Sequence, residues 1–183
     1  MSRIKNAKKM ETKRFKIVSA QSNIDWVGRK VTGAHNGTIS IKEGEIVMSD
    51  GKLTGGRFIA DTGSIKILDI TDPVTNAQFA GHLASDDFFS TDKYPEAIFE
   101  VVSVSGVFVV GDLTIKGISR PAALNIALDV DGDRLTVTGK LVIDRTEYGM
   151  KFRSGNFFKD LGDNLIYNDF ELNVNINAEK FIK

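Results

Sequence analysis

Residues 170–177 alternate strictly between apolar and polar side chains. Phenylalanine, leucine, valine and isoleucine occupy every second position of this segment, and glutamate or asparagine occupies the positions between them. A period of two is typical of a β-strand that buries one face and exposes the other, as the strands of antiparallel sheets do. The same alternation occurs at 124–130 and at 135–143, on both sides of the hairpin dipeptide Asp131-Gly132. The sequence therefore predicts an antiparallel sheet.

Shorter alternating or β-branched segments extend this sheet along most of the chain. They lie at 24–28, 35–41, 58–62, 98–104 and 107–115. They do not alternate regularly with helices, which argues against a parallel sheet. Closing a sheet of about eight antiparallel strands removes its exposed edges. We therefore predict an all-β fold with one principal helix, a lipocalin-like antiparallel β-barrel of about eight strands.

The principal helix is predicted over 73–84. Asp72 supplies a capping carboxylate and is followed directly by proline, which is favoured at the first helical position. Phe79 and Leu83 are four residues apart and therefore share one face. We expect this face to lie against the sheet. A second, short helix is predicted near 155–161.

Three glycines, Gly28, Gly37 and Gly139, fall on the inward side of the alternation. A barrel of about eight strands either fills its interior with side chains or holds one small ligand. Inward glycines mark tight bends of the strands, or they leave room for a ligand. Both interpretations are open at this point, so the residues alone predict a barrel that can hold an apolar molecule.

The residue types that the chain lacks exclude several kinds of chemistry. The absence of cysteine excludes disulfides, thiolate zinc sites and cysteine nucleophiles. Only two histidines are present, His35 and His82, which excludes a three-histidine metal site. Basic and acidic residues number 24 each, so a nucleic acid is not expected as a partner. Neither a metal site nor a cofactor is predicted.

The first 13 residues are rich in lysine and arginine. No apolar run of the length found in a signal peptide follows them, and no stretch has the length of a membrane span. We therefore predict a poorly ordered basic tail at 1–13 and a single domain at 14–183. The expected location is the cytoplasm, with peripheral contact with a membrane at most.

Motifs of the common enzyme classes are missing from the chain. It has no GxGxxG, no phosphate-binding GxxxxGK[ST] and no GxSxG. His82 with Asp86 or Asp87 is the remaining candidate for an acid–base pair. A catalytic imidazole should lie within hydrogen-bond distance of a carboxylate and face open volume. The main prediction is that the protein is not an enzyme.

Three motifs, in this order, resemble those of one bacterial family. GHLASDDFF occupies 81–89, GDLTIKGISRP occupies 111–121, and DRTEYGMKFRSGNFF occupies 144–158. Together with WVGRK at 26–30, they resemble the YceI-like family, the bacterial polyisoprenoid-binding barrels. The resemblance extends over about residues 15–180.

The resemblance implies an elongated apolar tunnel inside the barrel that holds a polyisoprenoid or another long-chain amphiphile, such as a fatty-acid-like lipid. It also implies a homodimer and no metal or redox cofactor. The chain departs from the family at two points: Ser119 replaces the usual threonine, and Ala80-Gly81 replaces an arginine–aspartate pair. A head-group contact through that pair is therefore lost.

The tunnel has candidate residues of two kinds. An isoprenoid chain offers no hydrogen bonds, so its affinity must come from buried apolar area, and its polar head must lie at the tunnel mouth near a cation. The candidates for the apolar lining are Trp26, Ile39, Phe58, Phe79, Leu83, Phe88, Phe89, Phe99, Leu113, Phe152 and Phe158. The candidates for the polar end are Lys30, His82, Arg145 and Arg153. Phe88 and Phe89 are adjacent, so in an extended segment only one of them can point inward.

The leading hypothesis is a binding or carrier protein for a polyisoprenoid or a related long-chain lipid. One alternative is an enzyme that acts on a lipid-like substrate inside the barrel. Another is a structural or stress-related protein whose barrel is filled by side chains. Trp26, the only tryptophan, shares a face with Ile24 and Gly28. We expect its ring to contact the lipid and its N–H to find a polar partner at one end of the site.

Overall fold

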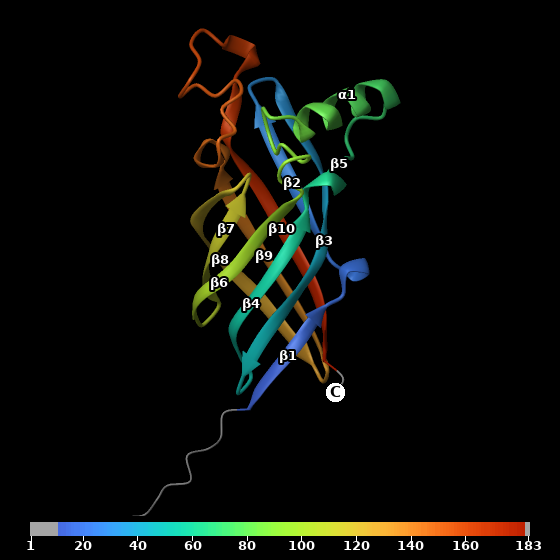
Figure 1. Cartoon of the computed structure of the whole chain (residues 1–183), viewed down its shortest axis with the longest axis vertical. Helices are drawn as coiled ribbons and strands as arrows, with labels where there is room; N and C mark the ends of the chain where they lie inside the picture. Colours follow the sequence, from blue (N-terminus) through green and yellow to red (C-terminus); the bar gives the residue numbers. More distant parts are fainter. Residues whose placement is uncertain (1–10, 182–183) are drawn as a thin grey trace, which may run out of the picture.

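The strand predicted at 170–177 closes a β-barrel, because it pairs with one strand on each side (Figure 1). The computed structural model describes residues 11–181. In it, β10 (Ile166–Lys180) pairs antiparallel with β9 (Arg134–Asp144) on one side and with β2 (Asn23–Lys30) on the other. The ring is completed, in spatial order from β2, by β3 (Gly33–Ser49), β4 (Lys52–Asp61), β6 (Glu96–Ser105), β7 (Phe108–Ile115) and β8 (Ile118–Asp131). The predicted lipocalin-like antiparallel barrel is confirmed.

Two strands, β1 (Thr12–Ile17) and β2, lie between β3 and β10, each along a different part of β3. β2 pairs with the first half of β3, and β1 pairs with the ends of β3 and β10. The basic tail predicted at 1–13 falls largely on residues 1–10, which lie outside the described residues. Thr12 and Lys13 belong to β1. The first strand therefore begins before the predicted domain boundary at residue 14.

The inward faces of the strands are buried as the alternation predicts. In β10, Leu172, Val174 and Ile176 are buried, whereas Asn173 and Asn175 between them are exposed. The other strands contribute isoleucine, leucine, valine and phenylalanine side chains to the same core. Burial of this apolar area is the main force that stabilises the barrel.

The three inward glycines have two different roles. A Cβ atom on Gly37 would lie 1.7 Å from the carbonyl oxygen of Lys66, and one on Gly139 would lie 2.6 Å from a leucine side chain. These two glycines permit close packing of neighbouring segments. A Cβ atom on Gly28 would meet only the ring of Trp26, at 4.0 Å. Gly28 therefore leaves open space beside that ring.

The helix α1 (Pro73–Ala84) lies at one end of the barrel and spans the predicted residues (Figure 1). The carboxylate of Asp72 accepts hydrogen bonds from the N–H and the hydroxyl of Thr75, at 3.0 and 2.6 Å, as an N-cap residue does. A short strand, β5 (Lys66–Ile67), precedes α1 and pairs with β3. Within residues 11–181, no helix is long and apolar enough to cross a membrane.

The prediction of a second helix near 155–161 is wrong. Residues 155–157 form a turn, and a single 3-10 turn follows at Gly162–Asn164. Arg153, Asp160 and Gly162 have positive φ angles of 50°, 56° and 52°, a conformation that cannot continue a right-handed helix. The loop between β9 and β10 therefore stays irregular, and it stands at the same end of the barrel as α1 (Figure 1).

Candidate functional site

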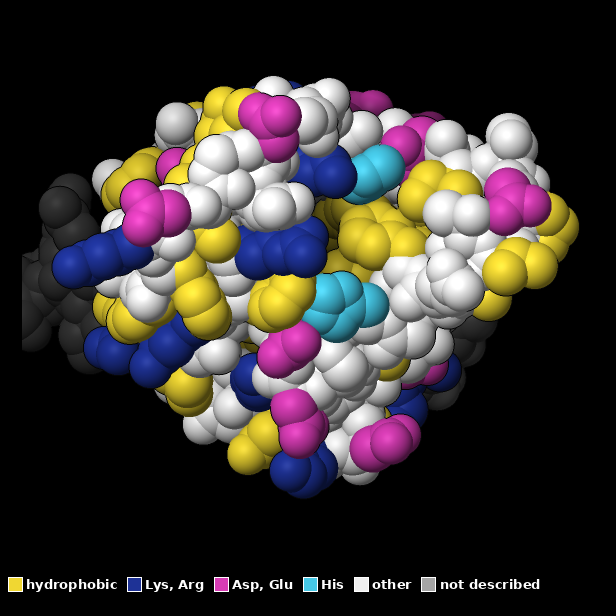
Figure 2. Space-filling view, turned by 90° about the horizontal axis from the view of Figure 1, so that it is seen from above, with side chains coloured by type: hydrophobic (Ala, Val, Ile, Leu, Met, Phe, Trp, Pro, Cys, Tyr) yellow, Lys and Arg dark blue, Asp and Glu magenta, His cyan; other side chains and the backbone are white. Residues whose placement is uncertain are grey.

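An apolar pocket of about 360 Å³ opens at the end of the barrel where α1 lies. Its walls come from α1, from the facing ends of β2, β3 and β10, and from the loop between β9 and β10. Seen from this end, the surface is hollowed (Figure 2). Hydrophobic side chains lie inside the hollow, and the two histidines and several Lys or Arg side chains flank it.

Most of the residues predicted for an apolar lining meet in this pocket. Those in its walls are Trp26, Ile39, Phe79, Leu83, Phe88, Phe89 and Phe152. Phe58, Phe99 and Leu113 lie deeper, in the walls of two smaller cavities of about 30 and 60 Å³. Phe158 lines none of these three cavities and is 47% exposed, because the turn that begins at Ser154 carries it outward. Its predicted place in the tunnel is wrong.

Trp26 forms one wall of the pocket. Its side chain is 8% exposed, and its indole N–H donates a hydrogen bond to the carbonyl oxygen of Lys66 at 3.2 Å. Lys66 belongs to β5, so this bond joins the wall formed by β2 to the short strand beside it. The polar partner expected for the indole is thus a backbone carbonyl.

Both phenylalanines that follow α1 line the pocket, although only one was expected to point inward. That expectation assumed an extended segment. The chain instead turns here: the N–H of Phe88 donates to the carbonyl of Ser85, and the N–H of Phe89 donates to the carbonyl of Leu83, each at 3.0 Å. A turned backbone does not alternate its side chains between two faces. Both rings can therefore face the pocket.

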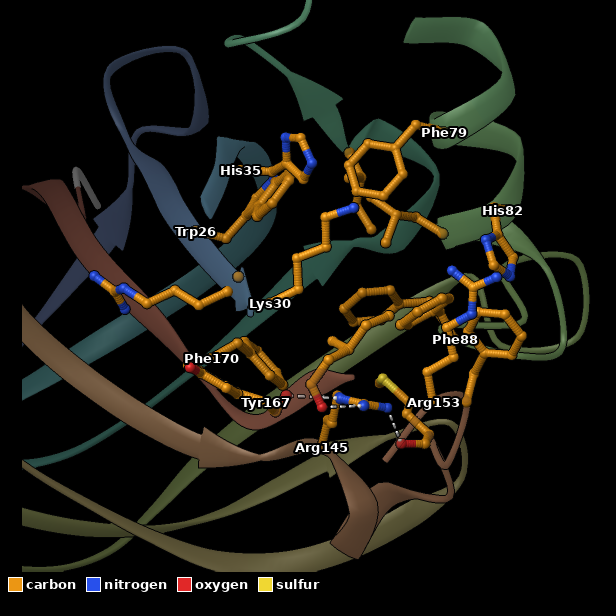
Figure 3. Close-up of a pocket in the computed structure, with 18 of the residues that line it drawn as sticks. Trp26, Lys30, His35, Phe79, His82, Phe88, Arg145, Arg153, Tyr167 and Phe170 are labelled. Carbon is orange, nitrogen blue, oxygen red and sulfur yellow. Dashed lines mark hydrogen bonds between the residues drawn. The ribbon is translucent and has the colours of Figure 1, made fainter. Parts of the chain in front are cut away.

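Three of the four residues predicted for a polar head group lie at the rim of the pocket, namely Lys30, His82 and Arg153. Lys30 extends from β2 into the pocket (Figure 3). Arg153 packs its guanidinium against the ring of Phe152, 5.0 Å from the ring centroid. Neither Lys30 nor Arg153 forms an ion pair with any residue between 11 and 181. Both cations therefore have N–H donors available for a ligand.

The fourth, Arg145, also lines the pocket, but its guanidinium is hydrogen-bonded to the backbone. Its side chain is 3% exposed, and it donates hydrogen bonds to the backbone carbonyls of Tyr167, Met150 and Ile166 at 3.1, 2.6 and 3.1 Å (Figure 3). Burial lowers the pKa of this guanidinium, and the nearby carboxylate of Asp144 opposes that shift. We therefore assign Arg145 a structural role, in which it joins the loop after β9 to the start of β10.

His82 meets the geometric condition set for a catalytic pair. Its Nε2 atom lies 3.0 Å from Oδ2 of Asp87, and the residue lines the pocket. The imidazole also packs edge-on against the rings of Phe88 and Phe152, with centroids 5.0 and 4.6 Å away. Among the described residues, no side-chain hydroxyl is hydrogen-bonded to this imidazole, and the hydroxyl of Ser85 donates to the backbone carbonyl of His82 at 2.6 Å instead.

The other histidine at the rim, His35, is held by a second carboxylate. Its Nδ1 atom lies 2.8 Å from Oδ2 of Asp69, whose other oxygen accepts a hydrogen bond from the N–H of Asn36 at 3.0 Å. The imidazole packs against Phe79 of α1 at a centroid distance of 4.9 Å. Burial by itself raises the pKa of Asp69, but the hydrogen bonds from Asn36 and His35 lower it below its ordinary value. His35 thus connects β3 to α1.

The lowered pKa of Asp69 makes one contribution to stability depend on pH. The contribution is present above the ordinary pKa of 3.8 and is lost as the pH falls through the lower, folded-state pKa. We expect Asp69→Asn to lower the melting temperature at neutral pH, and the difference from the wild type to shrink as the pH falls below about 4. Calorimetry over a pH series measures this difference.

The matched control for that series is Asp129→Asn, because the Asp129 side chain makes no hydrogen bond or ion pair with residues 11–181. Its effect on the melting temperature should be small at every pH. If the melting temperature of Asp69→Asn stayed below that of the wild type by the same amount down to the lowest pH, the stabilising role given to the Asp69 carboxylate would be contradicted.

Several residues of the pocket wall were not among the predicted ones. Phe170 and Leu172 lie on the inward face of β10, and the alternation that identified this face could have included them. Ile65, Ile70 and Met150 also line the pocket but come from irregular segments. No periodicity there indicates which side of the chain faces inward.

Sequence comparison relates the chain to a known family. The profile of the YceI-like domain matches residues 15–178. UPF0312 proteins of Staphylococcus aureus, for example from the strains N315 and bovine RF122, are 41% identical over 80 residues. The matching segment is 39% of this chain and 46% of those proteins, so the chain spans about half the length of the curated relatives it matches.

Solved structures share the barrel. Burkholderia cenocepacia BcnA superposes with a TM-score of 0.69 at 20% identity, covering 88% of this chain and 99% of that one. A polyisoprenoid-binding domain from Saccharophagus degradans superposes with a TM-score of 0.63 at 17% identity, covering 91% and 98%. At such identities the likeness shows the fold alone. The family profile, however, extends from β1 into β10, and the chain belongs to the YceI-like domain family.

Proposed function

We propose that this protein binds one long-chain amphiphile, a polyisoprenoid or a fatty-acid-like lipid, and acts as its carrier. The observation behind the proposal is a pocket of about 360 Å³ whose walls are almost wholly apolar and whose rim bears two cations, Lys30 and Arg153, that have no carboxylate partner among residues 11–181. The tail would be held by buried apolar area, at about 0.8 kcal/mol per CH₂ group. The head would stay at the rim, where Lys30 and Arg153 offer N–H donors and His82 lies beside them.

Two further observations support a lipid ligand. The Saccharophagus degradans domain that shares this fold is a polyisoprenoid-binding domain. The inner half of the barrel is largely filled by side chains, as the structural-protein alternative predicts, but the outer pocket is not. A filled barrel gives no reason for an open apolar pocket at one end, whereas a carrier requires one.

The fluorescence of Trp26 tests this proposal, because Trp26 is the only tryptophan and forms part of the pocket wall. Adding geranylgeraniol or palmitate to delipidated protein should shift or quench the emission until the site is saturated. Lys30→Glu should weaken the binding of palmitate about tenfold, because a charge-assisted hydrogen bond is replaced by repulsion. The same variant should bind uncharged geranylgeraniol as the wild type does.

Lys52→Glu is the matched control, because it makes the same charge change at the start of β4, at the opposite end of the barrel (Figure 1). It should leave both affinities unchanged. An emission that responds to neither lipid would contradict the proposed function. Equal losses of palmitate affinity in Lys30→Glu and Lys52→Glu would contradict the role given to Lys30.

Catalysis on a lipid-like substrate is a second candidate function, and the hydrogen bond of 3.0 Å between His82 and Asp87 is the observation that favours it. It predicts turnover of a long-chain ester, such as p-nitrophenyl palmitate, that His82→Gln abolishes while binding is retained. The carrier function predicts no turnover by the wild type above the rate in buffer. We favour the carrier because the described pocket wall offers no nucleophile bonded to this imidazole.

We also propose that the protein is a homodimer, as the family resemblance implies. The hairpin of β6 and β7 exposes Val102, Val107 and Phe108, by 63%, 54% and 45%, and exposed apolar side chains of this kind are often covered by a partner. Sedimentation should give twice the mass of the chain, and a monomer at micromolar concentration would contradict the proposal. The cytoplasmic location stays a prediction, which cell fractionation tests.

A further inference from the structure

The pocket is separated from the inside of the barrel by a layer of side chains. The outer pocket of about 360 Å³ and a middle cavity of about 30 Å³ have four wall residues in common, which are Ile39, Phe89, Phe170 and Leu172. The rings of Phe89 and Phe170 meet edge to face, with centroids 6.5 Å apart. Removing or turning these rings would lengthen the pocket along the barrel.

The volume of the outer pocket limits the chain that fits without such a movement. An apolar cavity of about 150 Å³ holds one benzene molecule, so a bound carbon needs about 25 Å³. At that ratio the outer pocket of about 360 Å³ holds a chain of about 14 carbons. A polyisoprenoid of about 30 to 40 carbons exceeds this volume more than twofold.

We propose that the pair Phe89 and Phe170 sets the length of lipid chain that this site accepts. Chains of up to about 14 carbons fill the outer pocket with the two rings in place. The additional carbons of a longer chain gain no buried area unless the rings turn aside. The proposal rests on the proposed lipid-binding function and adds the class of chain that binds best.

The surroundings of Phe170 allow its ring to move. Phe170 pairs with Gly28 across β10 and β2, and the pairing of these strands is irregular just before it, between Ile166 and Phe170. Gly28 has no side chain, and the space where its Cβ would lie is open except for the ring of Trp26 at 4.0 Å. Phe170 therefore has free volume next to its ring. It lies on the side of the pocket opposite Phe79 (Figure 3).

A second aromatic pair, deeper in the barrel, has no such freedom. Phe58 and Phe99 stack with centroids 5.5 Å apart, and Phe58 lies between the middle cavity and the inner one of about 60 Å³. Phe99 is 4% exposed and packs over Gly111, where an added Cβ would lie 2.5 Å from the ring. Close packing on this side holds Phe99 in place. Opening the first pair therefore lengthens the pocket, and the second pair ends the lengthened pocket.

A series of straight-chain fatty acids from 8 to 20 carbons tests this proposal, with affinities measured by calorimetry below the micelle concentration of each acid. For the wild type, the affinity should rise about fourfold per methylene up to about 14 carbons and then level off. Phe170→Ala removes the ring at the boundary. It should move this limit to longer chains by several carbons.

Phe89→Leu gives a second, milder opening of the same layer in case Phe170→Ala fails to fold, and Phe157→Ala, an exposed ring outside the cavities, is the control. A wild-type affinity that climbs at a constant rate through 20 carbons would overturn this proposal, as would an identical limit in the wild type and in both opened variants. Those results would leave the proposed function standing. Failure of every acid and of geranylgeraniol to bind would instead overturn the proposed function, and this proposal with it.

Discussion

Replacing Arg145 by methionine is expected to lower the free energy of unfolding by about 3 kcal/mol. The guanidinium is 3% exposed and donates hydrogen bonds to three backbone carbonyls, two of them in the first residues of β10. Methionine fills a similar volume but donates nothing, so all three carbonyls lose this donor, the carbonyl of Met150 in a buried bond and the other two in part-buried ones. Each unsatisfied buried group costs about 1 to 3 kcal/mol, and relaxation of the loop offsets part of the total.

Urea unfolding followed by circular dichroism measures this loss. The control is Arg57→Met, because the Arg57 side chain is exposed and forms no ion pair or hydrogen bond with residues 11–181, and this change should stay within about 0.5 kcal/mol. Arg145→Lys should recover only part of the stability, because an ammonium cannot reach three separated carbonyls as a guanidinium does. Equal losses in Arg145→Met and Arg57→Met would refute the structural role of Arg145.

Gly37→Ala is expected to destabilise the fold by a similar amount, about 3 kcal/mol. The new Cβ atom would lie 1.7 Å from the carbonyl oxygen of Lys66 and 2.7 Å from the ring of Trp26. Neither the backbone of β5 nor a buried indole yields easily, so β5 must separate from β3. Trp26 would then lose its hydrogen bond to Lys66. A red shift of the tryptophan emission should accompany the loss of stability.

Gly81→Ala is the matched control, since it makes the same chemical change at a glycine with the opposite surroundings. Gly81 lies within α1, and no atom beyond its chain neighbours and the adjacent helix backbone would come within 4 Å of its Cβ. Alanine stabilises a helix by up to about 1 kcal/mol relative to glycine, so this variant should be slightly more stable than the wild type. The two changes should therefore have opposite signs, and a stabilising Gly37→Ala would contradict the close packing of β5 on β3.

The periodic parts of the structure could be predicted from the sequence because their periodicity reflects burial directly. The alternation in β10 identified an inward face, and the Asp72 cap with the Phe79–Leu83 spacing located α1. The segments at the ends of the barrel have no such periodicity. Phe88 and Phe89 both line the pocket because hydrogen bonds of a turn position them, and a turn has no repeating pattern.

The loop between β9 and β10 shows most clearly what a linear pattern leaves out. Arg145 resembled a free cation in the sequence, yet its partners are carbonyls 5 to 22 residues away that only the folded loop brings together. Phe158 resembled a wall residue, but positive φ angles at Arg153 and Asp160 turn the backbone around it. Hydrogen bonds to backbone atoms carry no residue-specific signal, so neither outcome could be read from residue types.

If the pocket beneath α1 holds a long-chain lipid, that lipid should copurify with the protein. The protein is expressed in bacteria, purified without detergent and extracted with organic solvent, and the extract is quantified by mass spectrometry. Gly28→Phe is prepared in parallel. The open space at Gly28 lets this side chain occupy the pocket, and the variant is accepted for comparison once its circular dichroism matches that of the wild type.

Long-chain amphiphiles are expected in the wild-type extract at an amount approaching one per barrel, and in a severalfold smaller amount in the extract of Gly28→Phe. Lipid held by the outer surface would be the same in both, because the substitution changes only the pocket. Wild-type protein without any long-chain species, or equal amounts from the wild type and Gly28→Phe, would contradict the claim that the pocket is a lipid-binding site.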